Sequence, residues 1–129
     1  MSSLSRLILL CGAGALGTLA RYAAYLLSAR LFGERLPIGT VVVNLLGSFL
    51  FGVVWAFAER MTRGGPEVRL LALTGFMGAF TTFSTFASDI ARLVQAGRWG
   101  LAIGDLVVQN GGGVAAIVLG WYVVRLGFG

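Results

Sequence analysis

The sequence predicts an all-α integral membrane protein with four transmembrane helices. Hydrophobic residues make up 57% of the 129 residues and charged residues only 12%, whereas about 25% of the residues of a typical soluble domain are charged. The mean hydropathy is +0.89. Because a membrane-spanning helix needs about 20 apolar residues, a chain of this length holds about four or five spans joined by short loops. No room remains for a separate soluble domain.

Composition also excludes several classes of site. A single cysteine cannot form an intramolecular disulfide, and without histidine the Cys/His zinc sites are absent. Ten arginines against five acidic residues give a net charge of +5. They are scattered singly along the chain, so we expect loop charges at the surface of a lipid bilayer and no nucleic-acid partner.

The first span is expected over Leu4 to Ser28. A secretory signal peptide is the alternative, because Arg6 precedes an apolar stretch that small residues follow. The apolar run continues into Arg21 and three further runs follow, which favours a span. Arg21 either reaches the membrane surface with its long side chain or lies in a wet vestibule, where it raises the local concentration of anions.

The second span is expected over Gly39 to Ala58 and carries a line of polar side chains. Thr40, Asn44 and Ser48 recur at four-residue spacing and therefore share one helical face. Such groups hold neighbouring helices together in many membrane proteins. Asn44 is the exception, since an uncharged amide donor near the middle of a span can meet an anion without adding a permanent charge.

The third span is expected over Val68 to Gln95, and its middle is unusual. The twelve residues from Gly75 to Phe86 contain two glycines, three threonines, a serine and four phenylalanines. Glycine and threonine are poorer helix formers than leucine or alanine, so we expect a break in the third helix. A break frees backbone carbonyls at membrane depth, and these are hard ligands suited to a small cation.

A phenylalanine stripe follows the same stretch. Phe80, Phe83 and Phe86 recur at three-residue spacing, and we expect them on a common face. Helix packing is one interpretation. The other is an ion path, because the positive edges of phenyl rings stabilise an anion weakly without trapping it. Ring edges, the asparagine amide, and threonine or serine hydroxyls together make an uncharged anion path.

The fourth span is expected over Trp99 to Val124. Small residues four apart in several spans indicate close helix packing: Ala13 and Gly17, Ser48 and Gly52, and Gly112, Ala116 and Gly120. Few charges lie inside the spans; Asp89 and Arg92 are three residues apart and are expected to pair, and Asp105 lies early in the fourth span.

Arginine is almost evenly divided between the two faces of the predicted bundle. The face with the N-terminus has Arg6, Arg60, Arg63, Arg69 and Arg125, and the other face has Arg30, Arg35, Arg92 and Arg98. Arginine bias in loops normally sets orientation. Five against four indicates either a weak topology signal or insertion in both orientations with an inverted copy as partner.

Three blocks of this sequence resemble the bacterial fluoride channels of the CrcB/Fluc family. They are Cys11 to Tyr22 (CGAGALGTLARY), Pro37 to Phe49 (PIGTVVVNLLGSF) and Gly75 to Phe86 (GFMGAFTTFSTF). The third block is the most specific. The resemblance covers the first three spans at matching spacing, and the fourth agrees in length and position.

The resemblance implies an antiparallel, dual-topology homodimer with two fluoride pores. It places Asn44, Phe83 and Phe86 in the pores, and the basic residue of the first helix on Arg21. From the chemistry of the residues themselves, we expect the hydroxyls of Thr40, Thr82 and Ser84 in the same ion pathway. The resemblance also implies a structural Na⁺ at the dimer centre, held by the backbone carbonyls of Gly78 and Thr81.

The implied function is passive export of cytoplasmic fluoride across the bacterial inner membrane, which reduces fluoride toxicity; an enzyme is not expected. The fourth span departs from the family pattern, because Gly113 stands where a serine is expected. Gln109 or Asn110 is therefore left as the group that lines the pore there.

Two other functions remain as alternatives. A coupled carrier like the small multidrug-resistance proteins also has four spans and dual topology, but depends on a glutamate in its first span, which this chain lacks. A non-transporting assembly subunit accounts equally well for the glycine and phenylalanine stripes.

Overall fold

The computed structural model describes residues 2–33 and 36–127, and in these ranges the chain is helical without strands. Four helical stretches are long and apolar enough to cross a membrane: Ser3–Phe32, Ile38–Arg60, Gly65–Gln95 and Trp99–Gly127. The predicted all-α fold with four membrane-spanning helices is confirmed. Glu34 and Arg35, which the sequence places in the first loop, lie outside the described residues.

The first two spans are single helices, α1 (Ser3–Phe32) and α2 (Ile38–Arg60), and the other two are composite. The third comprises α3 (Gly65–Val68), the π-helix η1 (Arg69–Met77), α4 (Gly78–Phe80) and α5 (Phe83–Gln95). The fourth comprises α6 (Trp99–Val107), the π-helix η2 (Val108–Gly112) and α7 (Gly113–Gly127).

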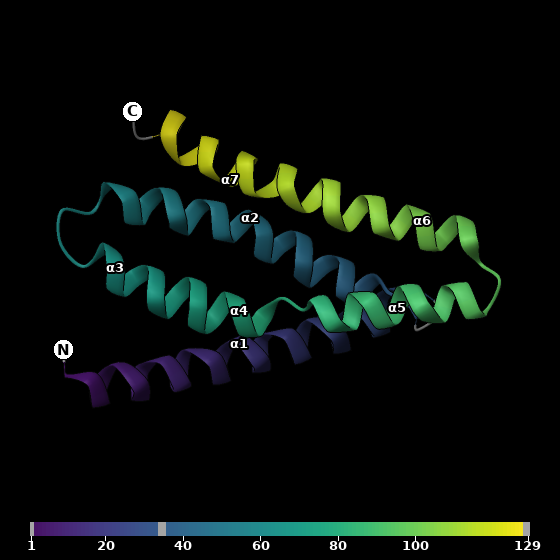
Figure 1. Cartoon of the computed structure of the whole chain (residues 1–129), viewed down its shortest axis with the longest axis horizontal. Helices are drawn as coiled ribbons and strands as arrows, with labels where there is room; N and C mark the ends of the chain where they lie inside the picture. Colours follow the sequence, from purple (N-terminus) through teal and green to yellow (C-terminus); the bar gives the residue numbers. More distant parts are fainter. Residues whose placement is uncertain (1, 34–35, 128–129) are drawn as a thin grey trace.

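The four spans lie roughly along one direction (Figure 1). The beginning of α1, the connection from α2 to α3 and the end of α7 lie at one end of the bundle, and the turn from α5 to α6 lies at the other. Extended backbone separates α4 from α5, where Thr81 has φ −81° and ψ 160° and Thr82 has φ −152° and ψ 117°.

Glycines bring α2 and α7 into backbone contact. A Cβ atom at Gly52 would overlap the carbonyl oxygen of Ile117, and one at Gly120 would overlap that of Phe49. Gly17 of α1 lies in the same way against the carbonyl of Phe76 in η1. The small residues of the sequence therefore serve close helix packing within one chain.

A small apolar core joins α2 to the third span: Val43, Leu73, Met77 and Phe80. Phe80 is only 5% exposed and stacks on Phe76, with ring centroids 5.9 Å apart. The expectation that Phe80 shares a face with Phe83 and Phe86 is wrong, because the extended residues between α4 and α5 interrupt the helical periodicity. Phe80 belongs to the core.

Candidate functional site

Thr82 organises the extended segment between α4 and α5. Its side-chain oxygen caps α5 by accepting a hydrogen bond from the Thr85 amide at 3.2 Å. Its own amide donates to Oδ1 of Asn44 at 2.8 Å, whereas in a continuous helix it would donate to the carbonyl of Gly78. Side chains of two spans thus replace helical hydrogen bonds at membrane depth.

Asn44 is the centre of a chain of polar side chains that links three spans. Its Nδ2 donates to the Thr82 carbonyl at 3.0 Å and to Oε1 of Gln109 at 2.6 Å. Gln109 in turn donates through Nε2 to Oδ1 of Asp105 at 2.8 Å. We call Thr82, Asn44, Gln109 and Asp105 the central polar chain. Both amide hydrogens of Asn44 are engaged inside the protein.

A cavity of about 310 Å³ lies beside the central polar chain. Its lining residues come from the last three spans: Asn44, Gly47, Ser48, Phe51, Thr81, Thr82, Phe83, Phe86, Gln109, Asn110 and Ile117. Phe86 is buried, whereas Phe83 is 76% exposed, and their ring centroids lie 5.7 Å apart at an interplanar angle of 56°. The cavity is therefore lined by one buried and one exposed ring of this pair. No charged side chain is among its lining residues.

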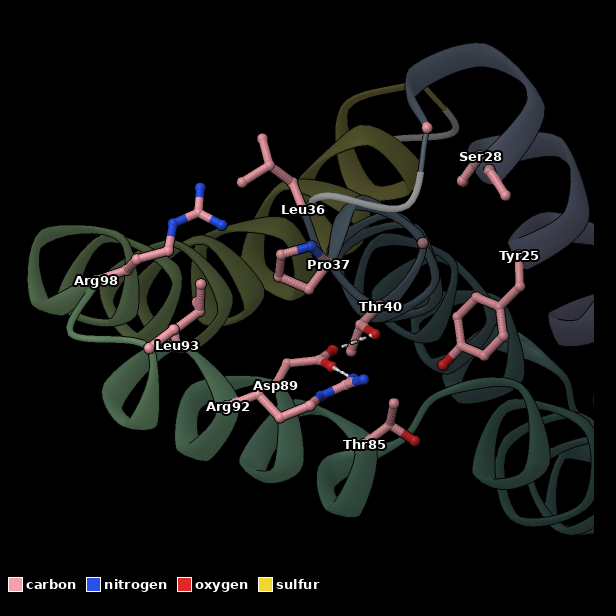
Figure 2. A pocket seen from close by; sticks show the side chains of 14 residues that line it. Tyr25, Ser28, Leu36, Pro37, Thr40, Thr85, Asp89, Arg92, Leu93 and Arg98 are labelled. Carbon is pink, nitrogen blue, oxygen red and sulfur yellow. Dashed lines mark hydrogen bonds and ion pairs between the residues drawn. The ribbon is translucent and has the colours of Figure 1, made fainter.

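A second cavity, of about 430 Å³, opens at the end of the bundle where α5 turns into α6 (Figure 2). Asp89 is buried there; it accepts a hydrogen bond from Oγ1 of Thr40 at 2.7 Å and pairs with Arg92, as the spacing predicted. The hydroxyl of Tyr25, which also lines this cavity, is buried and has no hydrogen-bond partner in the described part of the chain. Thr40 thus lines a different cavity from Asn44.

The other predicted site residues lie around the extended segment. Arg21 donates through Nη1 to the carbonyl of Thr81 at 3.4 Å. Gly78 is exposed, and the hydroxyl of Ser84 lies 3.5 Å from that of Thr82. Among the described residues, no three His, Cys, Asp or Glu side chains gather in a metal-binding group.

The fourth span contributes two residues to the central polar chain. The sequence left the role of Gln109 open and gave no expectation that Asp105 would lie at the site. Gln109 is buried in the central polar chain, whereas Asn110 is exposed and bonds to the Leu106 carbonyl of its own helix at 2.7 Å. The four-residue spacing of Asp105 from Gln109 was the available signal, because side chains at that spacing meet on a helix.

The family model and the individual relatives that match this chain point to the same family. Residues 8–121 match the family described as CrcB-like protein, Camphor Resistance (CrcB). A protein of Nitrosococcus oceani named fluoride-specific ion channel FluC is 47% identical over 119 residues, which cover 92% of this chain and 94% of the relative. A protein of the same name from Nitratidesulfovibrio vulgaris is 44% identical over 95% of this chain and 96% of the relative. Another, from Solidesulfovibrio magneticus, is 49% identical over 88% of this chain and 91% of the relative.

Proposed function

The chain belongs to the CrcB-like protein family, and from that membership we propose that it is a multi-pass membrane channel for fluoride. Relatives that carry the name of a fluoride-specific ion channel match at 44 to 49% identity over most of the chain. Channels are not enzymes, and the proposed activity is passive movement of the anion down its gradient.

The observation that carries the proposal is the central polar chain beside the pair formed by Phe83 and Phe86. Fluoride accepts hydrogen bonds, and Asn44 presents amide hydrogens at membrane depth without a net charge. We propose that fluoride takes the place of Oε1 of Gln109 as the acceptor for one of these hydrogens. The edges of the two phenyl rings then stabilise the partly dehydrated ion without trapping it.

The hydroxyl-bearing residues extend the proposed path from the centre toward the end of the bundle with the second cavity. Thr82 and Ser84 lie next to the phenylalanine pair, and Thr40 lies at the second cavity. Arg21 holds a positive charge near Thr81, where it raises the local concentration of anions. Hydrogen fluoride crosses membranes as a neutral acid and dissociates inside, so a leak in the bacterial inner membrane would export fluoride from the cytoplasm.

We further propose that the working unit is an antiparallel homodimer with two pores. Phe83, Ser84 and Asn110 are exposed at membrane depth in one chain. Polar groups facing hydrocarbon are costly, so a second copy is the natural cover for this side of the cavity. An inverted copy repeats the arrangement, which gives two equivalent paths.

A structural Na⁺ at the centre of that dimer is part of the same proposal. The carbonyls of Gly78 and Thr81 lack their regular helical donors, because the amides of Thr82 and Thr85 donate to Asn44 Oδ1 and Thr82 Oγ1. Backbone carbonyls fit a hard cation. The Thr81 carbonyl also accepts a hydrogen bond from Nη1 of Arg21 at 3.4 Å and keeps a second lone pair for the cation. One chain thus supplies two carbonyls, and a symmetric pair of chains supplies four. Bound cation would hold the two extended segments together at the dimer centre.

Fluoride efflux from liposomes tests the proposed channel. Purified full-length protein is reconstituted into vesicles loaded with potassium fluoride, and an electrode follows external fluoride before and after valinomycin provides a path for potassium. A channel releases fluoride rapidly only once potassium can move, because uncompensated anion flux stops at a membrane potential. No release in either condition would overturn the proposal and favour the assembly subunit, whereas proton-coupled cation export would identify the carrier.

A further inference from the structure

Two tryptophans, two arginines and one glutamate form a compact group at the end of the bundle opposite the second cavity. Nε1 of Trp55 donates to Oε1 of Glu59 at 2.8 Å, and Nε1 of Trp121 approaches Oε2 of the same carboxylate at 3.4 Å. The guanidinium of Arg69 lies 5.5 Å from the ring centroid of Trp55, and that of Arg125 lies 4.0 Å from the ring centroid of Trp121. We call these five residues the interfacial cluster.

The hydrogen bonds of Glu59 fix how the cluster presents its charge. Each carboxylate oxygen accepts from an indole, so both rings are held in place and each offers a face to an arginine. Within the described residues, neither Arg69 nor Arg125 has a carboxylate within ion-pair distance. Stacking on a ring leaves the N–H edge of a guanidinium available, and that edge matches phosphate oxygens in a bidentate way.

The cluster lies where lipid headgroups are expected. It joins the last turns of α2 and α7 to the first residue of η1, and these segments meet at one end of the bundle (Figure 1). Tryptophan is enriched at the boundary between membrane and water. Arg60 adds a third positive side chain, since its Nη2 lies 3.4 Å from the carbonyl of Arg125. One carboxylate between the two stacked arginines leaves an excess of positive charge.

We propose that the interfacial cluster binds the phosphate of an anionic phospholipid headgroup. Arg69 and Arg125 donate to the phosphate oxygens, and Trp55 and Trp121 hold the two guanidinium groups in place. The acyl chains run toward the membrane centre along exposed apolar side chains of α7, such as Val118, which is 47% exposed and lies two turns before Arg125. This contact distinguishes a phospholipid from free phosphate, because only the lipid also covers apolar surface. The inference is independent of the ion that the protein conducts.

Tryptophan fluorescence tests the site in the full-length protein. The chain has three tryptophans, and Trp99 lies away from the cluster, at the start of α6. Trp99→Phe therefore leaves reporters only in the cluster. Dioctanoyl phosphatidylglycerol, dioctanoyl phosphatidylcholine and inorganic phosphate are titrated separately into this protein in an uncharged detergent. We expect saturable binding of phosphatidylglycerol, weaker binding of phosphatidylcholine, and no response to phosphate at the same concentrations.

A matched pair of variants assigns the preference to the stacked arginines. Arg69→Gln with Arg125→Gln should weaken phosphatidylglycerol binding by roughly twentyfold. Arg30→Gln with Arg63→Gln removes the same charge from positions outside the cluster and should leave binding within about twofold. If phosphatidylglycerol binding weakens equally in both double variants, the preference depends only on the net charge of the protein, and the proposed site is overturned. Equal affinity for the two lipids, or an equal response to inorganic phosphate, would overturn the headgroup assignment.

A salt titration of the protein with intact arginines needs no variant and therefore cannot fail through misfolding. Raising sodium chloride from about 0.05 M to about 0.5 M should weaken phosphatidylglycerol binding severalfold through screening and leave phosphatidylcholine binding nearly unchanged. Phosphatidylglycerol binding that is independent of salt would contradict a contact between phosphate and arginine.

The double variant Arg69→Lys with Arg125→Lys keeps the positive charge but loses the planar guanidinium fork. It should retain part of the preference for phosphatidylglycerol over phosphatidylcholine. Complete loss of that preference would contradict a contribution from charge.

Discussion

Asn44 makes more hydrogen bonds inside the protein than the sequence indicated, because its neighbours come from two other spans. The sequence indicated an amide donor available to an anion at membrane depth. The structure gives both amide hydrogens to protein acceptors, the Thr82 carbonyl and Oε1 of Gln109. The type and depth of the residue were predictable, but its partners belong to two other spans, and one sequence carries no signal for such long-range pairs. An ion that binds Asn44 must therefore compete with Gln109.

Replacing Asn44 should lower both stability and flux. Asn44→Leu leaves the amide and carbonyl of Thr82 without their side-chain partner at membrane depth, which should reduce the free energy of unfolding by about 1 to 3 kcal/mol. Fluoride efflux should fall at least roughly tenfold through loss of the donor. Unfolding in mixed micelles measures the first effect, and liposome efflux measures the second.

Asn110→Leu is the matched control for the stability effect. The side chain of Asn110 is exposed and bonds to a carbonyl of its own helix, so its loss should change the unfolding free energy by less than about 1 kcal/mol. An equal loss of stability in the two variants would contradict the central position of Asn44 among the spans.

Phe83 and Phe86 are expected to control flux far more than stability. Phe83 is 76% exposed, so Phe83→Ile removes a ring edge with little change in packing, and Phe86→Ile keeps an apolar side chain in a buried position. The double variant should fold and lose fluoride efflux by at least roughly tenfold, because aliphatic side chains lack the positive ring edge. Phe32→Ile, at an exposed position near the end of α1, is the control. Unchanged efflux in the double variant would exclude both rings from the path.

At the level of elements, the number of spans was predictable and their internal shape was not. Long apolar runs separated by charge mark four spans with little ambiguity. The helices extend farther than the apolar runs, since Arg30, Arg60 and Arg125 lie in the last turns of α1, α2 and α7. Long arginine side chains reach water from such positions, so each helix continues beyond the end of its apolar run. The π-helices η1 and η2 leave no comparable pattern in composition.

Packing of α2 against α7 should depend on glycine. Gly120→Ala places a methyl group against the carbonyl of Phe49, which is backbone and cannot move aside, and should destabilise the protein by about 1 to 3 kcal/mol. Gly104→Ala in α6 meets no atom within 4 Å and should leave stability unchanged or raise it by up to about 1 kcal/mol, because alanine is the better helix former. Unfolding in mixed micelles compares the two, and similar effects would contradict the close approach.

At the scale of the whole molecule, one chain leaves much of its membrane-spanning surface uncovered. Only 6% of the most apolar window of α1 is buried, against 28% for α2. Lipid can cover the apolar part of this surface, but the exposed polar groups beside Phe83 need protein or water. The proposed second copy meets that need, and the division of arginines, five on one face and four on the other, gives neither orientation an advantage.

Dual orientation can be measured directly on a single-cysteine protein. Cys11→Ser removes the only native cysteine, and Arg63→Cys then places one thiol in the exposed connection between α2 and α3. A membrane-impermeant maleimide added to intact spheroplasts should label about half of the molecules, since removing one arginine leaves four on each face. Permeabilised cells give the total. Labelling of all molecules, or of none, before permeabilisation would contradict dual topology.

Changing the number of arginines on each face tests whether fluoride export requires chains in both orientations. Arg30→Gln with Arg98→Gln leaves two arginines on one face against five on the other, and should bias insertion toward a cytoplasmic N-terminus. Arg6→Gln, Arg60→Gln and Arg63→Gln together leave two against four and should bias insertion the other way. Each biased protein expressed alone lacks inverted partners, so fluoride export from cells should fall. Coexpression supplies the missing orientation and should restore export, because the two proteins have the same pore residues. Full export by either biased protein alone, with its orientation verified by labelling, would exclude the inverted dimer as the conducting unit.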